Sequence, residues 1–198
     1  MDSAEATARA KSELRLKARA ARRALTPEQR VDAANRVALA IMSLPQMRDA
    51  RAVLSYKALP EELDLGPTMD RMRSLGVRVA LPRIGGPCKL QLHWHEPDDA
   101  LVMGEFGLLE PLPEAAVAPV AAIDVVLTPG VAYDRNGWRL GFGGGYYDTL
   151  FRELDSSVVR LGIAYDEQVV DELPKHAHDL PVDIVVTPLH VYRARTSS

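Results

Sequence analysis

The sequence predicts an α/β fold: a layered α/β/α arrangement with a mainly parallel central sheet. Three continuous apolar segments, at 124–130, 158–164 and 183–188, are typical of strands buried on both faces. Segments of helical character are interleaved with such strands, and that alternation favours parallel strands joined by helices. Ligands of such sheets bind beyond the carboxyl ends of the strands. The loops that follow the apolar segments are therefore expected to carry the functional residues.

The chain is expected to begin with two helices. The first covers a basic, alanine-rich segment from about residue 4 to residue 24. The second begins at Thr-Pro-Glu-Gln (26–29), a capping threonine with proline in the first turn and a glutamine placed to reach back, and runs to about Ser43. Residues 4–43 would then form an N-terminal basic helical segment of a single domain spanning 1–198.

The remaining elements follow from apolar periodicity and turn residues. Residues 89–95 (KLQLHWH) alternate as a half-exposed strand does, and Arg-Asn-Gly (135–137) is a turn signal just before a glycine-rich segment. Further strands are expected at 51–57 and 77–82, and short helices at 67–75 and from residue 146 onward.

The composition is that of an ordinary globular protein, and it bears on the partners and the compartment of the protein. Hydrophobic residues make up 47% and charged residues 26% of the 198, as in ordinary globular domains. The net charge of −3 does not indicate a nucleic-acid partner, and no apolar run approaches bilayer length. The single cysteine, Cys88, fits a reducing compartment. We therefore expect a cytoplasmic monomer without nucleic-acid or membrane partners.

Residues 139–148 (RLGFGGGYYD) carry the densest chemical signal. The glycine N–H groups can line a concave surface close to an anion, and the helix expected after them would present its positive end to the same anion. Arg139 adds a charged fork suited to phosphate oxygens, and Asp148 supplies the hard oxygen that Mg²⁺ prefers. A plain glycine turn is the alternative, because the segment is neither G-x-G-x-x-G nor a P-loop. The combination favours a Mg–nucleotide site.

The segment 127–150 (LTPGVAYDRNGWRLGFGGGYYDTL) resembles the signature of the 5-formyltetrahydrofolate cyclo-ligase family, also called methenyltetrahydrofolate synthetases. Further similarities follow in the family's order: Lys11 with Arg15, Tyr56 with Glu62-Leu63-Asp64, LPRI at 81–84, Gly107 with Glu110-Pro111, and HDLPVDIVVTP at 178–188. The chain departs from the family pattern at Leu65 and Thr149, and Phe142 fills a variable position of the glycine loop.

The resemblance implies conversion of 5-formyltetrahydrofolate to 5,10-methenyltetrahydrofolate, with ATP as co-substrate, Mg²⁺ as cofactor, and release of ADP and phosphate. It assigns Tyr56, Glu62 and Tyr146 to the folate substrate, and Asp148 and Asp183 to the metal. The ATP-binding residues that it implies are Lys11, Arg15, Arg139, Leu140, Gly141, Phe142, Gly143, Gly144, Gly145, Tyr146 and Tyr147.

Plainer interpretations stand beside these roles. Lys11 and Arg15 can belong to a solvated basic helix face, Asp183 can be a strand-edge residue, and the tyrosines can serve the core. The whole chain could also be a catalytically silent folate- or nucleotide-binding relative, or a sugar-phosphate isomerase or acyl-CoA transferase on a similar scaffold. Magnesium-dependent ATP consumption separates the cyclo-ligase from both alternatives.

Overall fold

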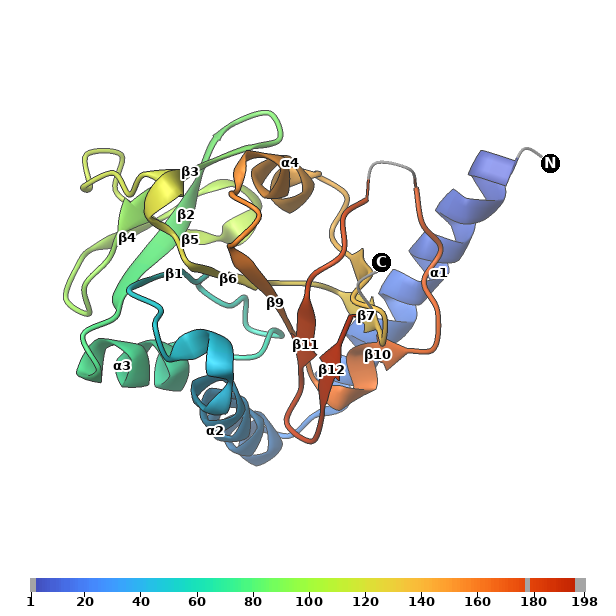
Figure 1. Ribbon diagram of the computed structural model, residues 1–198. Helices are drawn as coiled ribbons and strands as arrows, with labels where there is room; N and C mark the ends of the chain where they lie inside the picture. Colours follow the sequence, from blue (N-terminus) through green and yellow to red (C-terminus); the bar gives the residue numbers. More distant parts are fainter. Residues whose placement is uncertain (1–2, 177–178, 195–198) are drawn as a thin grey trace.

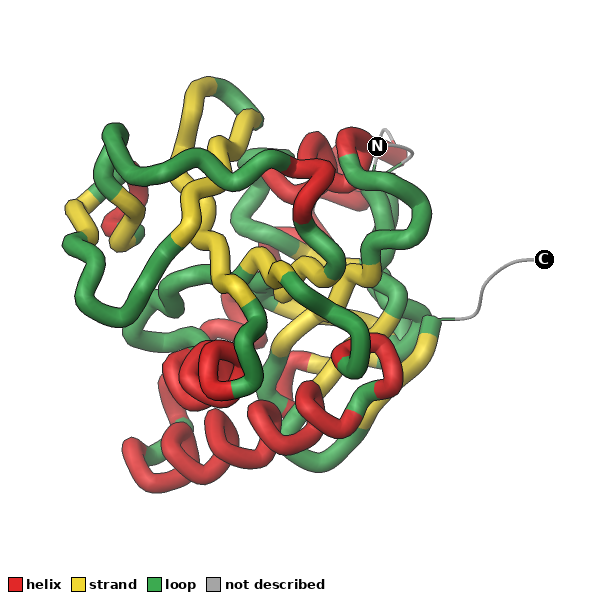
Figure 2. The backbone as a smooth tube through the Cα atoms, turned by 60° about the vertical axis from the view of Figure 1, so that its left-hand side comes forward, coloured by secondary structure: helices red, strands yellow, loops and turns green. Residues whose placement is uncertain are grey.

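The structure, a computed structural model, describes residues 3–176 and 179–194. It confirms the α/β/α layers: a seven-stranded, mostly parallel sheet lies between α2 and α3 on one face and α4 on the other (Figure 1). The helices are α1 (Ser3–Ala24), α2 (Pro27–Ser43), α3 (Gly66–Ser74) and α4 (Tyr146–Glu153), with 3₁₀ turns at Pro45–Met47, Glu105–Gly107, Val120–Ala122 and Asp166–Gln168. In the turned view of Figure 2 the strands again lie between helices.

The strands are numbered along the chain. They are β1 (Ala52–Leu54), β2 (Arg78–Gly86), β3 (Lys89–Trp94), β4 (Leu101–Met103), β5 (Leu109–Pro111), β6 (Val125–Thr128), β7 (Ala132–Asp134), β8 (Arg139–Leu140), β9 (Val159–Ile163), β10 (Val169–Val170), β11 (Ile184–Val186) and β12 (Val191–Arg193). Every predicted strand is present, although β1 is shorter and β2 longer than expected. The short strands β4, β5, β7, β8, β10 and β12 were not predicted as such.

The order of the main sheet is β12-β11-β9-β6-β1-β2-β3. The five inner strands are parallel, and the two edge strands β3 and β12 pair antiparallel with their neighbours. Val53 of β1 lies opposite Val79 of β2 on one side and Val125 of β6 on the other. The chain thus leaves β1 toward β2 and later returns on the opposite side as β6. This reversal creates a switch point at the carboxyl ends of β1 and β6, where open α/β sheets bind ligands.

Two cores fix the sheet between its helices. Val37, Ile41 and Met72 belong to the core that packs α2 and α3 against one face. Leu150 and Phe151 of α4 belong to the core on the other face. The α1 helix lies apart from both and packs against β7 and the turn after β9 (Figure 1). Because α1 docks on the small sheet β10-β7-β8, it reaches the carboxyl edge of the main sheet.

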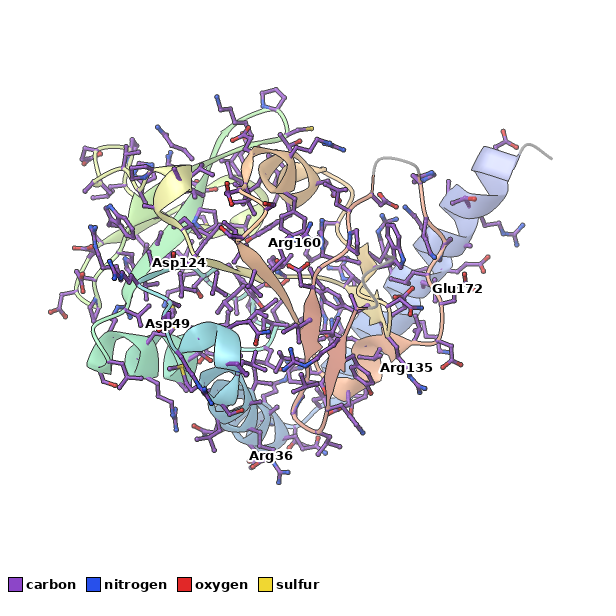
Figure 3. All side chains as sticks on the ribbon, in the orientation of Figure 1. Arg36, Asp49, Asp124, Arg135, Arg160 and Glu172 are labelled. Atoms are coloured by element: carbon purple, nitrogen blue, oxygen red, sulfur yellow. The ribbon has the colours of Figure 1, made fainter. Side chains whose placement is uncertain are left out.

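Side chains close the amino edge of the main sheet. The carboxylate of Asp124 accepts hydrogen bonds from the N–H groups of Arg51 and Ala52, at 2.7 and 2.9 Å. Arg160 of β9 binds both carboxylate oxygens of Asp183, which directly precedes β11, at 3.0 and 2.7 Å. Asp124 and Arg160 are labelled in Figure 3 beside the starts of β6 and β9. With this edge occupied by structural contacts, the carboxyl edge is the one available for ligands.

The cap of α2 has a measurable consequence. Oγ1 of Thr26 accepts a hydrogen bond from the N–H of Gln29, and the Gln29 side chain accepts one from the N–H of Thr26. Thr26→Ala is expected to lower the free energy of unfolding by about 1 kcal/mol, because it removes the capping acceptor. Urea denaturation measures this loss. Ser43→Ala, at the exposed end of the same helix, is the control and should change stability by less than about 0.5 kcal/mol.

Candidate active site

A cavity of about 700 Å³ opens at the carboxyl edge of the sheet. This volume is typical of small-molecule sites. Residues of α1, the loops after β1 and β6, strands β2, β3 and β8, the β4–β5 hairpin, the glycine loop, the start of α4 and the segment before β11 line it. They are Ala8, Lys11, Arg15, Arg19, Tyr56, Lys57, Leu59, Glu62, Pro82, Ile84, Leu90, Phe106, Leu108, Leu109, Glu110, Pro129, Arg139, Leu140, Gly141, Phe142, Gly143, Gly144, Gly145, Tyr146, Tyr147, Asp148, His176 and Asp179. The cavity thus brings together all the predicted ATP- and substrate-binding residues, and of the two predicted metal ligands only Asp148.

The glycine loop between β8 and α4 forms one end of this cavity, which we call the phosphate end after the role that the sequence predicts for the loop. Gly143 and Gly145 have φ of 106° and 67°, in the left-handed region that glycine tolerates without strain. Gly145 is also the residue that precedes the first turn of α4. The Arg15 side chain donates a 2.9 Å hydrogen bond to the carbonyl of Gly141, so α1 is tied directly to the loop. Arg15 is therefore more than part of a solvated helix face.

Arg139 lies at the phosphate end, where neighbouring side chains hold its guanidinium in place. Its guanidinium donates to the carboxylate of Asp148 at 2.9 Å, and only 7% of the side chain is exposed. Its Cζ atom lies 5.7 and 5.8 Å from the ring centroids of Tyr147 and Phe151. Among the described residues, its buried Nε has no hydrogen-bond acceptor. A fixed cation in the cavity wall favours an anionic ligand at this end.

Lys11 and Asp179 form a second ion pair at the same end. Nζ of Lys11 lies 2.7 Å from Oδ2 of Asp179, and both side chains are largely buried. Burial opposes ionisation of Asp179, but the hydrogen bonds from Lys11 and from the N–H of His176 hold the pKa of Asp179 below its usual value. The next residue, Leu180, donates its N–H to Oδ1 of Asp148 at 3.1 Å. The segment that carries Asp179 is therefore joined to Asp148, and both aspartates line the cavity.

Asp183 lies elsewhere, and the expectation that it joins Asp148 is not supported by its placement. Its carboxylate is engaged by the side chain and the N–H of Arg160 at the amino edge of the sheet. It does not line the cavity. Its position beside β9 follows from the parallel pairing of β11, which sets Asp183 at the start of the strand. Of the two aspartates of the HDLPVD segment, it is Asp179, four residues earlier, that lines the cavity.

The other end of the cavity lies at the loop after β1, and we call it the pterin end after the role that the resemblance implies for Tyr56 and Glu62. Tyr56 and Glu62 are buried there, and Glu62 accepts a 3.0 Å hydrogen bond from the N–H of Leu59. Burial raises the pKa of Glu62, while the Leu59 N–H and the nearby Arg22 act in the opposite direction. Tyr165 donates a 3.3 Å hydrogen bond to the carbonyl of Glu62 and fixes the loop. A carboxylate held in this way can accept hydrogen bonds from heterocyclic N–H groups.

The departures from the family pattern leave this geometry intact. Leu65 is fully buried in the core beneath α2 and α3, so its side chain packs against that core and does not line the cavity. Thr149 lies within α4 and donates its N–H to Gly145. Phe142 is exposed on the glycine loop, with the guanidinium of Arg19 lying 5.9 Å from its ring centroid.

Sequence reasoning missed several residues of the cavity. Arg19 and Lys57 were not singled out among the other basic residues, and Phe106 lies on a hairpin that was not predicted. Asp179 was within a quoted segment, but Asp183 was the aspartate singled out from it, and of the two it is Asp179 that lines the cavity. Sequence spacing alone could not tell which of the two carboxylates lies there.

Known proteins match the chain over most of its length. Residues 7–188 match the 5-formyltetrahydrofolate cyclo-ligase family. A 5-formyltetrahydrofolate cyclo-ligase of Escherichia coli K12 is 38% identical over 176 residues, covering 86% of this chain and 96% of the relative. The enzyme of that name from Mycolicibacterium smegmatis is 35% identical over 144 residues, covering 70% and 74%.

Solved structures agree with these matches. The NMR structure of Aquifex aeolicus 5,10-methenyltetrahydrofolate synthetase has a TM-score of 0.80 and 35% identity, covering 95% of this chain and 94% of that one. A Mycoplasma pneumoniae 5,10-methenyltetrahydrofolate synthetase, at 20% identity and a TM-score of 0.74, covers 90% and 98% and supports the fold alone. The chain belongs to the 5-formyltetrahydrofolate cyclo-ligase family, whose ATP-using cyclo-ligase activity it carries.

Proposed function

We propose that the protein closes the ring of 5-formyltetrahydrofolate to give 5,10-methenyltetrahydrofolate, using ATP and Mg²⁺ and passing through a phosphorylated formyl group. The observation that carries the proposal is the continuity of the cavity. Its phosphate end has the glycine loop with the cations Lys11, Arg15 and Arg139, and its pterin end has Tyr56 and Glu62. One cavity can therefore bring the γ-phosphate of ATP to the formyl oxygen of the folate.

The chemistry needs positioning more than a protein nucleophile. A formamide carbon is a poor electrophile, and its oxygen is a poor leaving group. Attack of the formyl oxygen on the γ-phosphorus releases ADP and leaves an imidate phosphate. N10 of the same substrate then attacks the activated carbon, and phosphate departs, the N10 proton being lost at this step. Because N10 belongs to the same molecule as the reacting carbon, the protein accelerates the reaction by orienting the substrates and stabilising charge on the phosphoryl group.

The polar residues divide this work between the two ends. Arg139 and Lys11 would neutralise the phosphate oxygens, and the N–H groups of the glycine loop would cradle them. Glu62 would accept hydrogen bonds from the pterin ring, with Tyr56 and Tyr146 packing on the bound molecules. These roles orient the formyl oxygen toward the phosphate and exclude water from it.

The donor set at the phosphate end fits a magnesium ion bound together with a nucleotide. Among the described residues, no group of three or more His, Cys, Asp and Glu side chains forms a self-sufficient metal site. Mg²⁺ on nucleotides commonly uses one or two carboxylates, and Asp148 and Asp179 supply these beside the glycine loop. We propose Asp179 in place of Asp183 for this role. When bound, the metal would neutralise charge on the transferring phosphoryl group.

Turnover is expected to require both ATP and Mg²⁺, because the formyl oxygen must be activated before N10 can displace it. ADP and phosphate should form in equal amounts with the methenyl product, followed through its near-ultraviolet absorption band. An undiminished rate of product formation in buffer that contains no nucleotide and in which Mg²⁺ is chelated would contradict this mechanism. Folate binding without any turnover would instead favour a catalytically silent binding protein. Turnover of sugar phosphates or acyl-CoA without ATP would favour a different enzyme.

The remaining expectations concern setting and assembly. We propose a single-domain, cytoplasmic monomer acting on small molecules, without a nucleic-acid partner. In the part of the chain that the structure describes, no helix has the length and apolar character to cross a bilayer. One relative, from Arabidopsis thaliana and 25% identical, is named as mitochondrial. Fractionation of source cells and light scattering of the purified protein test location and assembly.

A further inference from the structure

A fully buried arginine lies behind the pterin end of the cavity. Arg22, near the end of α1, is 1% exposed, yet it does not line the cavity. Its Nη1 atom lies 3.9 Å from Oε1 of Glu62, and its Nη2 atom 3.7 Å from Oε2 of Glu61. Among the described residues, its Nε and Nη1 atoms have no hydrogen-bond acceptor. A buried guanidinium with two nitrogens that lack acceptors is costly, so its position calls for an electrostatic reason.

The electrostatic partner of Arg22 is Glu62. Glu61 is 26% exposed at its side chain and already accepts a hydrogen bond from Arg23 on the surface. Glu62 has only a 6% exposed side chain, and its one hydrogen bond from the described residues is the N–H of Leu59. A carboxylate this buried retains its charge only beside a cation or several donors. Arg22 supplies that cation from outside the cavity lining.

Contacts around Arg22 hold it in place. Arg30 of α2 donates hydrogen bonds to the carbonyls of Arg22 and Leu25, where α1 ends and the chain turns into α2. These hydrogen bonds fix the end of α1, and from there the Arg22 side chain reaches the loop after β1. The junction of α1 and α2 therefore fixes the charge of Arg22 beside the carboxylate of Glu62.

We infer that Arg22 is a positioning residue, which keeps Glu62 ionised and aimed into the cavity so that Glu62 can accept the N–H groups of the reduced pterin. The inference rests on the proposed function for the identity of the ligand. It adds a residue that touches neither substrate and acts through Glu62. No sequence motif marks Arg22, since it stands among other basic residues of the same helix.

The sign of the pH effect follows from the groups that face Glu62. Burial raises the pKa of Glu62, and neighbouring Glu61 adds to that rise, while the Leu59 N–H and Arg22 lower it. The other titratable groups coupled to Glu62 are the buried phenols Tyr56, Tyr133 and Tyr147, with the Tyr165 hydroxyl on its carbonyl. Folate binding by the ionised form is lost as pH falls through the pKa of Glu62. Without Arg22 that pKa rises, so the loss begins at higher pH.

The test measures 5-formyltetrahydrofolate binding by calorimetry from pH 5 to 9 in wild type, Arg22→Met and Arg22→Lys. In Arg22→Met the pH midpoint should move up by about one unit or more, as expected for removal of a cation about 4 Å away. Arg22→Lys, which retains the charge, should bring the midpoint back toward that of wild type. Arg23→Met is the matched control: the same charge is lost from the next residue, whose ion-pair partner among the described residues is Glu61, and the midpoint should stay in place.

A second readout does not depend on folate. Carboxyl NMR of ¹³C-labelled glutamate, assigned with Glu62→Gln, follows the titration of Glu62 directly and should show the same upward shift in Arg22→Met. If the wild-type protein binds no folate at any pH, the proposed function fails. The NMR titration of Glu62 then still tests whether Arg22 lowers the pKa of Glu62. A folded Arg22→Met protein with an unchanged Glu62 titration overturns the inference. So does failure of both Arg22→Met and Arg22→Gln to fold, which would make Arg22 a determinant of folding instead.

Discussion

Arg139→Ala is expected to raise the ATP concentration needed for half-maximal rate by about ten- to over a hundred-fold, with a much smaller change for the folate. The guanidinium lies at the phosphate end of the cavity, hydrogen-bonded to Asp148 and with its Nε unpaired among the described residues. A charge-assisted contact to phosphate contributes roughly 1.5–3 kcal/mol, which is the stated range in affinity. Initial rates with each substrate varied in turn measure the two effects separately.

Arg160→Ala is the matched control for this experiment. Arg160 also pairs with an aspartate and lies over the ring of Phe151, at 5.4 Å from its centroid, but it is absent from the cavity lining. Its loss should lower stability while the half-saturating ATP concentration stays near that of wild type. Equal effects of the two substitutions on ATP use would mean that Arg139 acts only through the packing around Phe151, contrary to a phosphate contact.

Elements with local signals were predictable from the sequence. The start of α2 follows from a threonine cap, a first-turn proline and a reciprocal glutamine, all within four residues. The buried strands β6, β9 and β11 follow from continuous apolar segments, and the glycine loop from residues that accept positive φ. In each case the physical cause lies within a few residues of its effect, so the sequence alone reveals it.

The contacts that complete the site were not predictable, because they join distant parts of the chain. Lys11 and Asp179 are 168 residues apart in sequence and 2.7 Å apart in space. Arg22 reaches Glu62 only because α1 docks on the small second sheet, which the sequence did not reveal. The choice between Asp179 and Asp183 depends on strand register: β11 begins at Ile184, which leaves Asp183 beside β9 and Asp179 in the loop that reaches the cavity.

The phosphate-end carboxylates provide the second large effect. Asp148→Asn and Asp179→Asn are each expected to raise the magnesium concentration for half-maximal rate by about tenfold or more, the loss expected of one charged contact of about 1.5 kcal/mol. Asparagine is the appropriate replacement because it retains the shape and one oxygen while removing the charge that attracts the cation. The double mutant should lose less than the two single losses combined, since groups that serve one ion act as a unit.

Asp183→Asn is the control that separates the two candidate aspartates of the HDLPVD segment. Its carboxylate is occupied by Arg160 at the amino edge of the sheet, so its loss should lower the temperature of unfolding and leave the magnesium titration unchanged. Each variant is titrated with Mg²⁺ at saturating ATP and folate. A raised magnesium requirement in Asp183→Asn, with Asp179→Asn unaffected, would return the metal role to Asp183. It would also mean that the loop between them rearranges when nucleotide binds, because of these two aspartates Asp179 lines the cavity in the structure and Asp183 does not.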